Sequence, residues 1–432
     1  MGYEEAEAYL DALGVDAMKK MAPSLHRIEA LCEALDHPER RVQAIHVTGT
    51  NGKTSTARIA TALLGATGLK VGTYTSPHLE SVRERISLAG EPISKEDFGE
   101  AFDHLRPYLA HVEASVGERL SYFEVLTALF FLWAAETPVD AVVVEVGLGG
   151  LWDATNVVDG AVAVVTNVAL DHTALLGEDR QTIAREKVGI VKDGAVVVTG
   201  ERSPDILPIV TEAARAKKAV VSAFGTDFDL TDNRVAFGGR YIAVEASGST
   251  YDGLFLPLHG SHQGVNAAVA LEAVSRFLPS QQLDPGVVAE GLAAVTAPGR
   301  LETFRSEGAP PVVLDVAHNP DGMAAFVYSL VEAFAFDRAV VVLGVLADKD
   351  YRGMLAELAR IPCFLVLTEP RNARAVPASE LEDAAADFGL DAQIVDDVAD
   401  AVKVAMESAA AKDIVLVTGS HYVVGEARPL LA

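Results

Sequence analysis

Cysteine is nearly absent from the chain: Cys32 and Cys363 are the only two among 432 residues, and they lie far apart. This scarcity argues against a disulfide framework and against a thiolate zinc site, and it favours a reducing compartment. Long apolar runs are also missing, because the longest stretch, residues 139–146, has the length of a strand and cannot span a bilayer. The acidic segment 1–7 lacks the basic start of a secretory signal. We therefore expect a cytoplasmic protein that does not contact membranes.

Basic residues are scarce relative to acidic ones, with 35 Lys and Arg against 61 Asp and Glu and a formal net charge of −26. Such an acidic protein repels the phosphate backbone of nucleic acids and anionic membrane surfaces. An anionic substrate must then find a locally basic site. Adaptation to a saline cytoplasm would explain the acidity equally well, so composition predicts small-molecule partners without nucleic acid but does not identify them.

What the chain does contain is a glycine-rich loop between a predicted strand, residues 42–47, and a predicted helix, residues 53–66. Its glycines let backbone N–H groups close around phosphate oxygens, the helix N-terminus and Lys53 add positive charge, and Thr54 offers a hydroxyl to Mg²⁺. The longer standard pattern has a glycine where Val47 stands. The loop predicts nucleotide binding; the alternative is a glycine turn that only caps a helix. We call it the phosphate loop, and it consists of Gly49, Thr50, Asn51, Gly52, Lys53, Thr54 and Ser55.

Strands and helices alternate along most of the chain, which implies parallel sheets with helices on both faces. Residues 224–260 differ, because short β-like pieces with glycine-rich turns predict a small antiparallel sheet. The segment Ala297-Pro298-Gly299-Arg300 looks like a hinge, after which the alternation begins again. We predict an α/β protein: a P-loop-type doubly wound parallel sheet with a small appended β-sheet in residues 1–297, and a smaller C-terminal Rossmann-like α/β domain in residues 298–432.

Polar residues follow the predicted strands at the edge where ligands bind in open α/β sheets. Glu145 closes an apolar run, where a carboxylate is costly unless it is paired or bound to a metal. With Ser76 and His172 it offers oxygen and imidazole ligands, which suit Mg²⁺ or Mn²⁺ beside phosphates. In the second domain, Asp315 and His318 also follow a strand. The alternatives are a salt bridge or N-cap for Glu145, a structural role for His172, and ordinary turn chemistry in the second domain.

The order of these motifs, with further ones along the chain, resembles folylpolyglutamate synthase/dihydrofolate synthase of the Mur ligase superfamily. The resemblance spans nearly the whole chain. The matching segments lie at residues 49–53, 76–79, 145–150, 153–156, 171–172, 186–190, 262–263, 266–268, 298–300 and 315–320.

The resemblance implies an ATP-dependent ligase. Such an enzyme activates the carboxylate of a tetrahydrofolate or of dihydropteroate as an acyl phosphate, and the amine of L-glutamate then attacks to form an amide. The resemblance further implies a monomer with an ATP-binding domain in residues 1–297 and a glutamate-ligase domain in residues 298–432. Two other hypotheses stay open: a Mur-type amide ligase on another acyl acceptor, and a catalytically silent ATP-binding paralogue.

The resemblance also implies residue roles. The nucleotide would contact the phosphate loop together with Asn266, Arg300 and Asp315. The catalytic residues would be Lys53, Lys187, Asp315 and His318. A first Mg²⁺ would be bound by Thr54 (or Ser55), Ser76 and Glu145. A second would be bound by Glu145, His172 and a carbamylated Lys187. The substrates would contact Arg83, Tyr122, Phe123, Asp153 and Ser420.

Two of these roles have plain alternatives. A free Lys187 ammonium beside two cations would be repelled, and capture of CO₂ turns it into an anion; otherwise Lys187 is a solvated helix lysine. Tyr122 and Phe123 lie where the family stacks a pterin ring, but they would serve equally well in a core. The chain also departs from the family at Leu151, where an Arg is usual, and at His421, where an apolar residue is typical. Loss of the cation at Leu151 would weaken a contact to an anionic substrate or phosphate.

Overall fold

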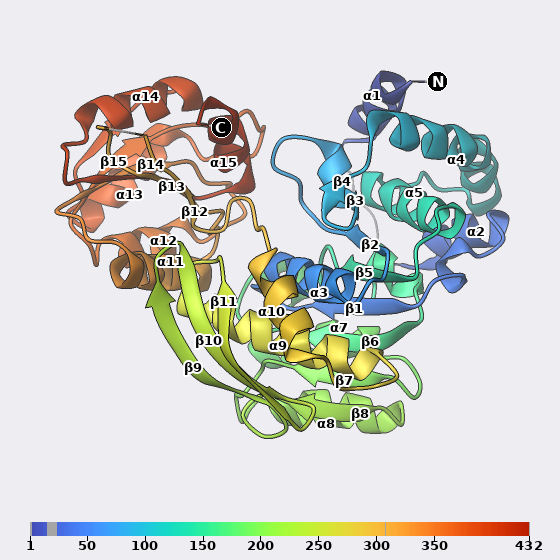
Figure 1. The fold of residues 1–432 in the computed structure, drawn as a ribbon. Coiled ribbons are helices and arrows are strands. Elements are labelled where there is room, and N and C mark those ends of the chain that lie inside the picture. Colours follow the sequence, from blue (N-terminus) through green and yellow to red (C-terminus); the bar gives the residue numbers. More distant parts are fainter. Residues whose placement is uncertain (1, 15–23, 307, 432) are drawn as a thin grey trace.

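The computed structural model describes residues 2–14, 24–306 and 308–431. The chain forms two α/β lobes, each built around its own sheet (Figure 1). No helix in the described part of the chain is long and apolar enough to cross a bilayer.

The larger lobe contains an eight-stranded sheet in the order β4-β3-β2-β5-β1-β6-β7-β8. Six strands pair in parallel, and the β3–β4 hairpin is antiparallel at one edge. Because helices cover both faces, the central strands β1 and β5 are mostly apolar and are buried along their whole length. The strands are β1 (Ala44–Thr48), β2 (Val71–Tyr74), β3 (Ile86–Leu88), β4 (Glu91–Pro92), β5 (Ala141–Glu145), β6 (Gly160–Val165), β7 (Val196–Thr199) and β8 (Val220–Ala223).

Two groups of helices cover the two faces of this sheet. One face packs against α1 (Tyr3–Leu13), α2 (His26–Ala34), α4 (Lys95–Val116), α5 (Tyr122–Glu136), α7 (Arg180–Lys187) and α8 (Leu207–Ala216). The other face packs against α3 (Lys53–Ala66), α9 (Ser261–Phe277) and α10 (Pro285–Ala293). Side-chain caps fix the starts of several of these helices; Ser121 and Glu124, for example, form a capping box at α5.

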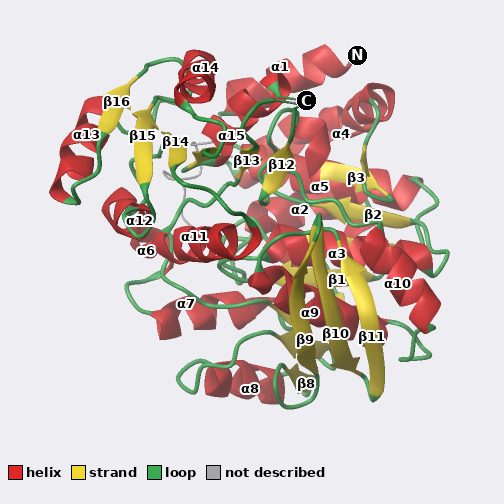
Figure 2. Ribbon diagram, turned by 60° about the vertical axis from the view of Figure 1, so that its left-hand side comes forward, coloured by secondary structure: helices red, strands yellow, loops and turns green. Residues whose placement is uncertain are grey.

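A three-stranded antiparallel sheet lies against α9 and α10, and one end of its strands reaches the second lobe (Figure 2). Its strands are β9 (Asp229–Ala236), β10 (Gly239–Ala246) and β11 (Ser249–Leu256). The buried Arg240 guanidinium on β10 donates to Glu332 of the second lobe at 2.6 Å. The small sheet therefore connects the two lobes.

The C-terminal lobe contains a six-stranded sheet in the order β12-β13-β17-β14-β15-β16, in which only the β12–β13 pair is antiparallel. Its strands are β12 (Glu302–Phe304), β13 (Val312–Leu314), β14 (Ala339–Leu343), β15 (Cys363–Leu367), β16 (Ala392–Ile394) and β17 (Ile414–Thr418). One face packs against α11 (Pro320–Ala333), α12 (Tyr351–Leu358) and α13 (Ala378–Asp387), and the other against α14 (Val398–Ser408) and α15 (His421–Ala427).

The predicted fold class is confirmed, including the small antiparallel sheet and the second, smaller α/β unit. The sequence did not predict β3, β4, β8, β12 or β16, which have two to four residues each and lie at or near sheet edges. Strands this short carry too little periodicity to be recognised. The predicted boundary at 297/298 falls between α10 and β12, and it stays a prediction.

Candidate active site

A cavity of about 630 Å³ lies between the two lobes, at the carboxyl ends of strands from both sheets. The phosphate loop lines it after β1, Glu145 ends β5, and the segment after β13 contributes Asp315 and His318. This is the edge at which the sequence predicts ligand binding.

The phosphate loop depends on its two glycines. Gly49 and Gly52 both have positive φ, of 150° and 82°. A Cβ on Gly49 would overlap the side chain of Thr166, and one on Gly52 would lie 2.6 Å from Asn266 Oδ1. Gly52 precedes α3, so the free N–H groups of the first helical turn point toward the loop. The loop therefore holds the shape of an anion-binding turn.

Lys53 folds back over this loop, where its Nζ donates to the carbonyl oxygens of Gly49 at 3.1 Å and Thr50 at 3.0 Å. Burial lowers its pKa, and the nearby carboxylates of Glu145 and Asp171 oppose that change. Neutral carbonyls only partly stabilise a buried cation. An incoming phosphate would be a stronger partner.

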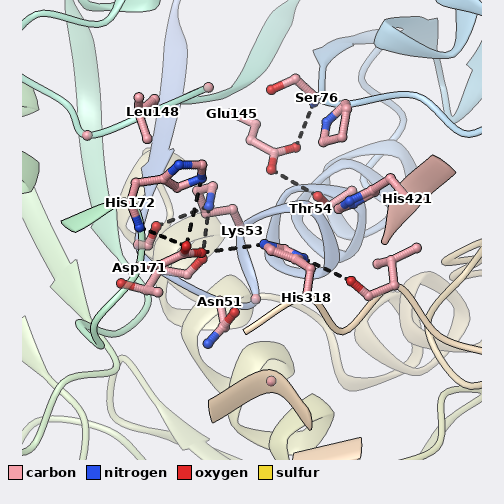
Figure 3. Close-up of a pocket in the computed structure, with 18 of the residues that line it drawn as sticks. Asn51, Lys53, Thr54, Ser76, Glu145, Leu148, Asp171, His172, His318 and His421 are labelled. Carbon is pink, nitrogen blue, oxygen red and sulfur yellow. Dashed lines mark hydrogen bonds and ion pairs between the residues drawn. The ribbon is translucent and has the colours of Figure 1, made fainter. Parts of the chain in front are cut away.

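Glu145, Thr54 and Ser76 meet beside the loop (Figure 3). The Glu145 carboxylate accepts a hydrogen bond from Thr54 Oγ1 at 2.9 Å and one from the Ser76 backbone N–H at 3.1 Å. Burial raises its pKa, against the effect of the Lys53 charge. A buried carboxylate beside a hydroxyl fits a Mg²⁺ that also takes phosphate and water oxygens. Among the described residues, however, no three His, Cys, Asp or Glu side chains gather as a metal-binding group.

Lys187 is buried at the end of α7, and its Nζ donates to the Gly49 carbonyl at 2.8 Å. Burial, together with the charge of Lys53, lowers its pKa to about 7. Lys187 is therefore not a solvated helix lysine. A lysine with this pKa is half neutral near pH 7, and only the neutral amine reacts with CO₂.

Asp171 is one of the residues through which the two lobes contact each other in the cavity (Figure 3). From the C-terminal lobe, Lys349 Nζ donates to it at 2.7 Å, Asn319 Nδ2 donates at 3.0 Å, and His318 Nε2 lies 3.5 Å away. Burial raises the pKa of Asp171, but His318 and Lys349 outweigh burial and hold the pKa well below its usual range. The carboxylate is therefore ionised and pairs with cationic and polar groups of the other lobe.

His172 contacts Lys349 of the Asp171 cluster, whereas the sequence predicts that it binds a metal together with Glu145. Its Nε2 accepts from Lys349 Nζ at 3.0 Å, and burial lowers its pKa to about 4. The structure thus brings together the residues predicted for a first Mg²⁺, but within the described ranges Glu145, His172 and Lys187 form no hydrogen bond or ion pair with one another.

Asp315 and Arg300 connect the hinge to the phosphate loop. The Asp315 carboxylate accepts from the backbone N–H groups of Leu301 at 3.0 Å and Ala317 at 2.9 Å, and burial raises its pKa to about 6. Arg300 Nη2 donates to Thr54 Oγ1 at 3.4 Å. Asn266, which abuts Gly52, donates to Gln263 Oε1 at 3.0 Å. All three predicted nucleotide contacts line the cavity.

The predicted substrate residue Arg83 lies elsewhere. Its Nη1 donates to the Ile93 carbonyl at 2.9 Å, and it is not among the described residues that line the cavity. Arg85 lines the cavity instead. Its Nε donates to His78 Nδ1 at 2.9 Å and its guanidinium lies 5.3 Å from the Tyr122 ring centroid, but the described part of the chain gives it no carboxylate partner.

The other four predicted substrate residues line the cavity, but they also have structural partners. Tyr122 and Phe123 are 5% and 8% exposed and belong to the core around α5. Asp153 accepts from the backbone N–H groups of Leu148 at 2.9 Å and Thr155 at 3.0 Å. Ser420 caps α15. Their substrate contacts remain predictions.

The two departures from the family pattern have different surroundings. Leu151 packs against Gly189 and is not among the described residues of the cavity wall, and the expected loss of a cationic contact there stays a prediction. His421 does line the cavity, and its buried Nε2 has no hydrogen-bond partner in the described structure.

Sequence reasoning missed Lys349 and Arg85 as site residues. A signal existed for Lys349, because it follows the apolar, strand-like residues 339–346 in the sequence, as Asp171 follows the strand β6. For Arg85 there was no such signal, because nothing in the sequence distinguishes Arg85 from the nearby Arg83.

Comparison with known proteins identifies the family. The chain matches the Mur ligase middle domain over residues 47–274 and the Mur ligase glutamate ligase domain over residues 299–421. A dihydrofolate synthase/folylpolyglutamate synthase of Mycobacterium tuberculosis is 40% identical over 95% of this chain and 90% of its own, and the Bacillus subtilis protein of that name is 32% identical over 95% of each.

Solved structures agree. The Mycobacterium tuberculosis folylpolyglutamate synthase complexed with ADP superposes with a TM-score of 0.94 at 38% identity, over 100% of this chain and 98% of its own. Escherichia coli FolC in complex with DHPP and ADP superposes with a TM-score of 0.87 at 31% identity, over 100% of this chain and 97% of its own. The chain belongs to the dihydrofolate synthase/folylpolyglutamate synthase family of Mur ligases.

Proposed function

We propose that this protein is an ATP-dependent ligase that adds L-glutamate to a tetrahydrofolate, to dihydropteroate, or to both. One observation carries the proposal: a phosphate loop with its lysine and a carboxylate–hydroxyl pair share a single cavity with Arg85, a buried arginine for which the described residues provide no acidic partner. The first set suits a nucleoside triphosphate, and the arginine suits a carboxylate substrate. The relatives compared above carry the name dihydrofolate synthase/folylpolyglutamate synthase, which supports a folate acceptor.

The reaction proceeds in two steps. A carboxylate oxygen of the acceptor attacks the γ-phosphorus of ATP while the bond to ADP breaks, which yields an acyl phosphate. The glutamate amine then attacks the acyl carbon, the bond to phosphate breaks, and the nitrogen loses a proton. Both steps depend on positioning and charge neutralisation.

The chain's own groups supply these functions. Lys53 would exchange the Gly49 and Thr50 carbonyls for phosphate oxygens, and Arg300 and Asn266 would contact the nucleotide. His318 and Asp315 would act from the C-terminal lobe, where Ser420 would contact glutamate. Arg85, in place of Arg83, would bind the acceptor's carboxylate. Residues 1–297 would thus bind ATP and residues 298–432 would complete the glutamate site, all within one monomer.

Metal ions and a modified lysine belong to the same proposal. Thr54, Ser76 and Glu145 would bind one Mg²⁺, and Glu145, His172 and a carbamylated Lys187 a second. Bound Mg²⁺ would neutralise the phosphate oxygens during transfer. The lowered pKa of Lys187 supports carbamylation, because it makes a neutral amine available to CO₂ near pH 7.

The test measures phosphate release in the presence of ATP, Mg²⁺ and L-glutamate, with tetrahydrofolate and dihydropteroate as separate acceptors. We expect release that requires every component and at least one of the two acceptors. No release with either acceptor would refute the proposal. Tight ATP binding without acceptor-stimulated turnover would then favour a silent paralogue, and turnover with another carboxylate would favour a different Mur-type ligase.

A further inference from the structure

Tryptophan occurs only twice in this chain, at Trp133 and Trp152, and the two rings differ in their surroundings. Trp133 is 6% exposed and packs in the core around α5, with its ring 6.2 Å from that of Phe130. Trp152 is 49% exposed and lines the cavity. A large apolar residue at the candidate active site thus leaves about half of its surface uncovered by the protein, a placement typical of ligand-binding surfaces.

Trp152 belongs to an apolar wall of the cavity that we call the apolar lip, formed by Leu148, Trp152, Leu175 and Leu176. Leu175 is 55% exposed, and α6 (Thr173–Leu176) buries none of its residues. The lip therefore has apolar surface that the protein itself does not cover.

The backbone that carries Trp152 is firmly held although its ring is exposed. Its N–H donates to Glu186 Oε1 at 3.3 Å, and the N–H of Leu151 donates to the Glu186 carbonyl at 2.9 Å. The Asp153 carboxylate holds the same loop through the Leu148 N–H at 2.9 Å. A fixed backbone beneath an exposed ring is a preorganised contact surface.

The aromatic residues predicted to stack on a substrate offer less surface than Trp152. The Arg85 guanidinium lies over the Tyr122 ring at 5.3 Å, and Phe123 packs against Tyr74 with ring centroids 5.9 Å apart. A Cβ on Gly147 would come within 2.5 Å of the Phe123 ring, so the Gly147 backbone also covers part of that ring. Trp152 is the more accessible aromatic ring at this end of the cavity.

We propose that the indole of Trp152 stacks on the flat heteroaromatic ring of the acyl-acceptor substrate, with the leucines of the apolar lip packing around it. This inference rests on the proposed function, which supplies an acceptor that carries such a ring. The lip follows Glu145 along one segment and His172 along another. A ring held there would share the cavity with both of these predicted metal ligands and with the phosphate loop.

Fluorescence tests the contact directly. In the Trp133→Phe variant Trp152 is the single emitter, and in Trp152→Phe the emitter is Trp133. We expect acrylamide to quench Trp152 strongly in the free protein, and saturating dihydropteroate or tetrahydrofolate to reduce the quenching constant about fivefold, while Mg²⁺-ATP alone leaves it unchanged. Trp133 should be poorly quenched throughout. Binding of the acceptor without protection of Trp152 would overturn the inference.

Steady-state kinetics provide a second readout. Replacing Trp152 by Leu should raise KM for the acceptor about tenfold and leave KM for ATP unchanged, whereas Trp152→Phe, which keeps a ring, should recover most of the loss. Equal effects of Leu and Phe, or a rise in KM for ATP, would contradict stacking. If the wild-type protein turns over neither acceptor, the proposed function is refuted. If the wild-type protein is active and the Trp152 variants leave KM for the acceptor unchanged, this inference alone is refuted.

Discussion

The two ends of the cavity are built differently. At the phosphate end, the polar groups are already paired within the protein: Lys53 with loop carbonyls, and Glu145 with Thr54 and Ser76. At the acceptor end, Arg85 has no carboxylate partner within the described residues and Trp152 is half exposed. The phosphate end is thus preformed, and the acceptor end is left to be completed by its ligand. Substitutions at the first should abolish chemistry, and those at the second should weaken binding.

The largest effect should come from Lys53→Ala. Removing the ammonium takes away the charge that would hold the triphosphate, so kcat should fall about 10³-fold, as when a preorganised electrostatic group is removed. ADP formation in the full reaction mixture measures this. Lys403→Ala, which changes an exposed lysine of α14, serves as the control and should retain wild-type rates. Comparable rates for Lys53→Ala and Lys403→Ala would contradict the assignment.

Lys187→Ala should lose about 10²-fold or more in kcat, because a charged group of the phosphate end disappears. If the native group is a carbamate, formate or acetate should restore part of the rate. The same acids should not rescue Lys53→Ala, because its missing group is a cation. Wild-type rates in Lys187→Ala, or equal rescue of both variants, would count against a carbamate.

The pH dependence of carbamylation follows from the pKa of Lys187. Burial lowers that pKa to about 7, so the amine is mostly protonated below pH 7 and mostly neutral above it. At constant dissolved CO₂, the carbamylated fraction should therefore rise between pH 6 and 8, as measured by ¹³C NMR with labelled CO₂. A fraction that falls over this range would contradict the assignment.

Asp171→Asn tests the contact between the lobes. Lys349 would keep its buried charge and lose its carboxylate partner, which typically costs about 3–5 kcal/mol. We expect a lower free energy of unfolding in urea and a lower kcat/KM. The double variant Asp171→Asn, Lys349→Met should be less destabilised than the sum of the single changes. The exposed Asp391→Asn is the control, and additive effects of the two site changes would argue against the pair.

The smallest effect should come from Arg85→Lys at the acceptor end. Lysine keeps the charge and loses the planar fork that binds a carboxylate through two hydrogen bonds. KM for the acceptor should rise about tenfold, equivalent to about 1.4 kcal/mol, while KM for ATP should stay unchanged. Arg83→Lys is the matched comparison. A large effect at Arg83 with none at Arg85 would restore the sequence-based assignment.

The two ends of the cavity also differ in how far their residues could be predicted from the sequence. The phosphate loop is one continuous segment whose glycines, lysine and flanking strand and helix all leave a local pattern. The positions of Glu145 and Asp315 could also be predicted, because each follows a strand and parallel strands bring their carboxyl ends to one edge of the sheet. Both residues line the cavity.

The acceptor end comes from separate segments, and the direction in which each side chain leaves its backbone decides whether it faces the cavity. Arg83 and Arg85 both lie in a short 3₁₀ helix, η3 (Val82–Arg85), where residues two apart differ in direction by about 240°. Nothing in the local sequence tells which of them faces inward. Lys349 and Asp171 lie in different lobes, and they meet because of the way the two lobes pack against each other. That packing is not visible in the sequence of any single segment.

Transfer of oxygen from the acceptor to phosphate tests the central claim most directly. With the acceptor's carboxylate labelled by ¹⁸O, an acyl phosphate intermediate must leave one labelled oxygen in the inorganic phosphate released with each amide formed. Mass spectrometry of the phosphate should therefore show one ¹⁸O per turnover. Amide formation with no label in the phosphate would contradict activation of the carboxylate by ATP.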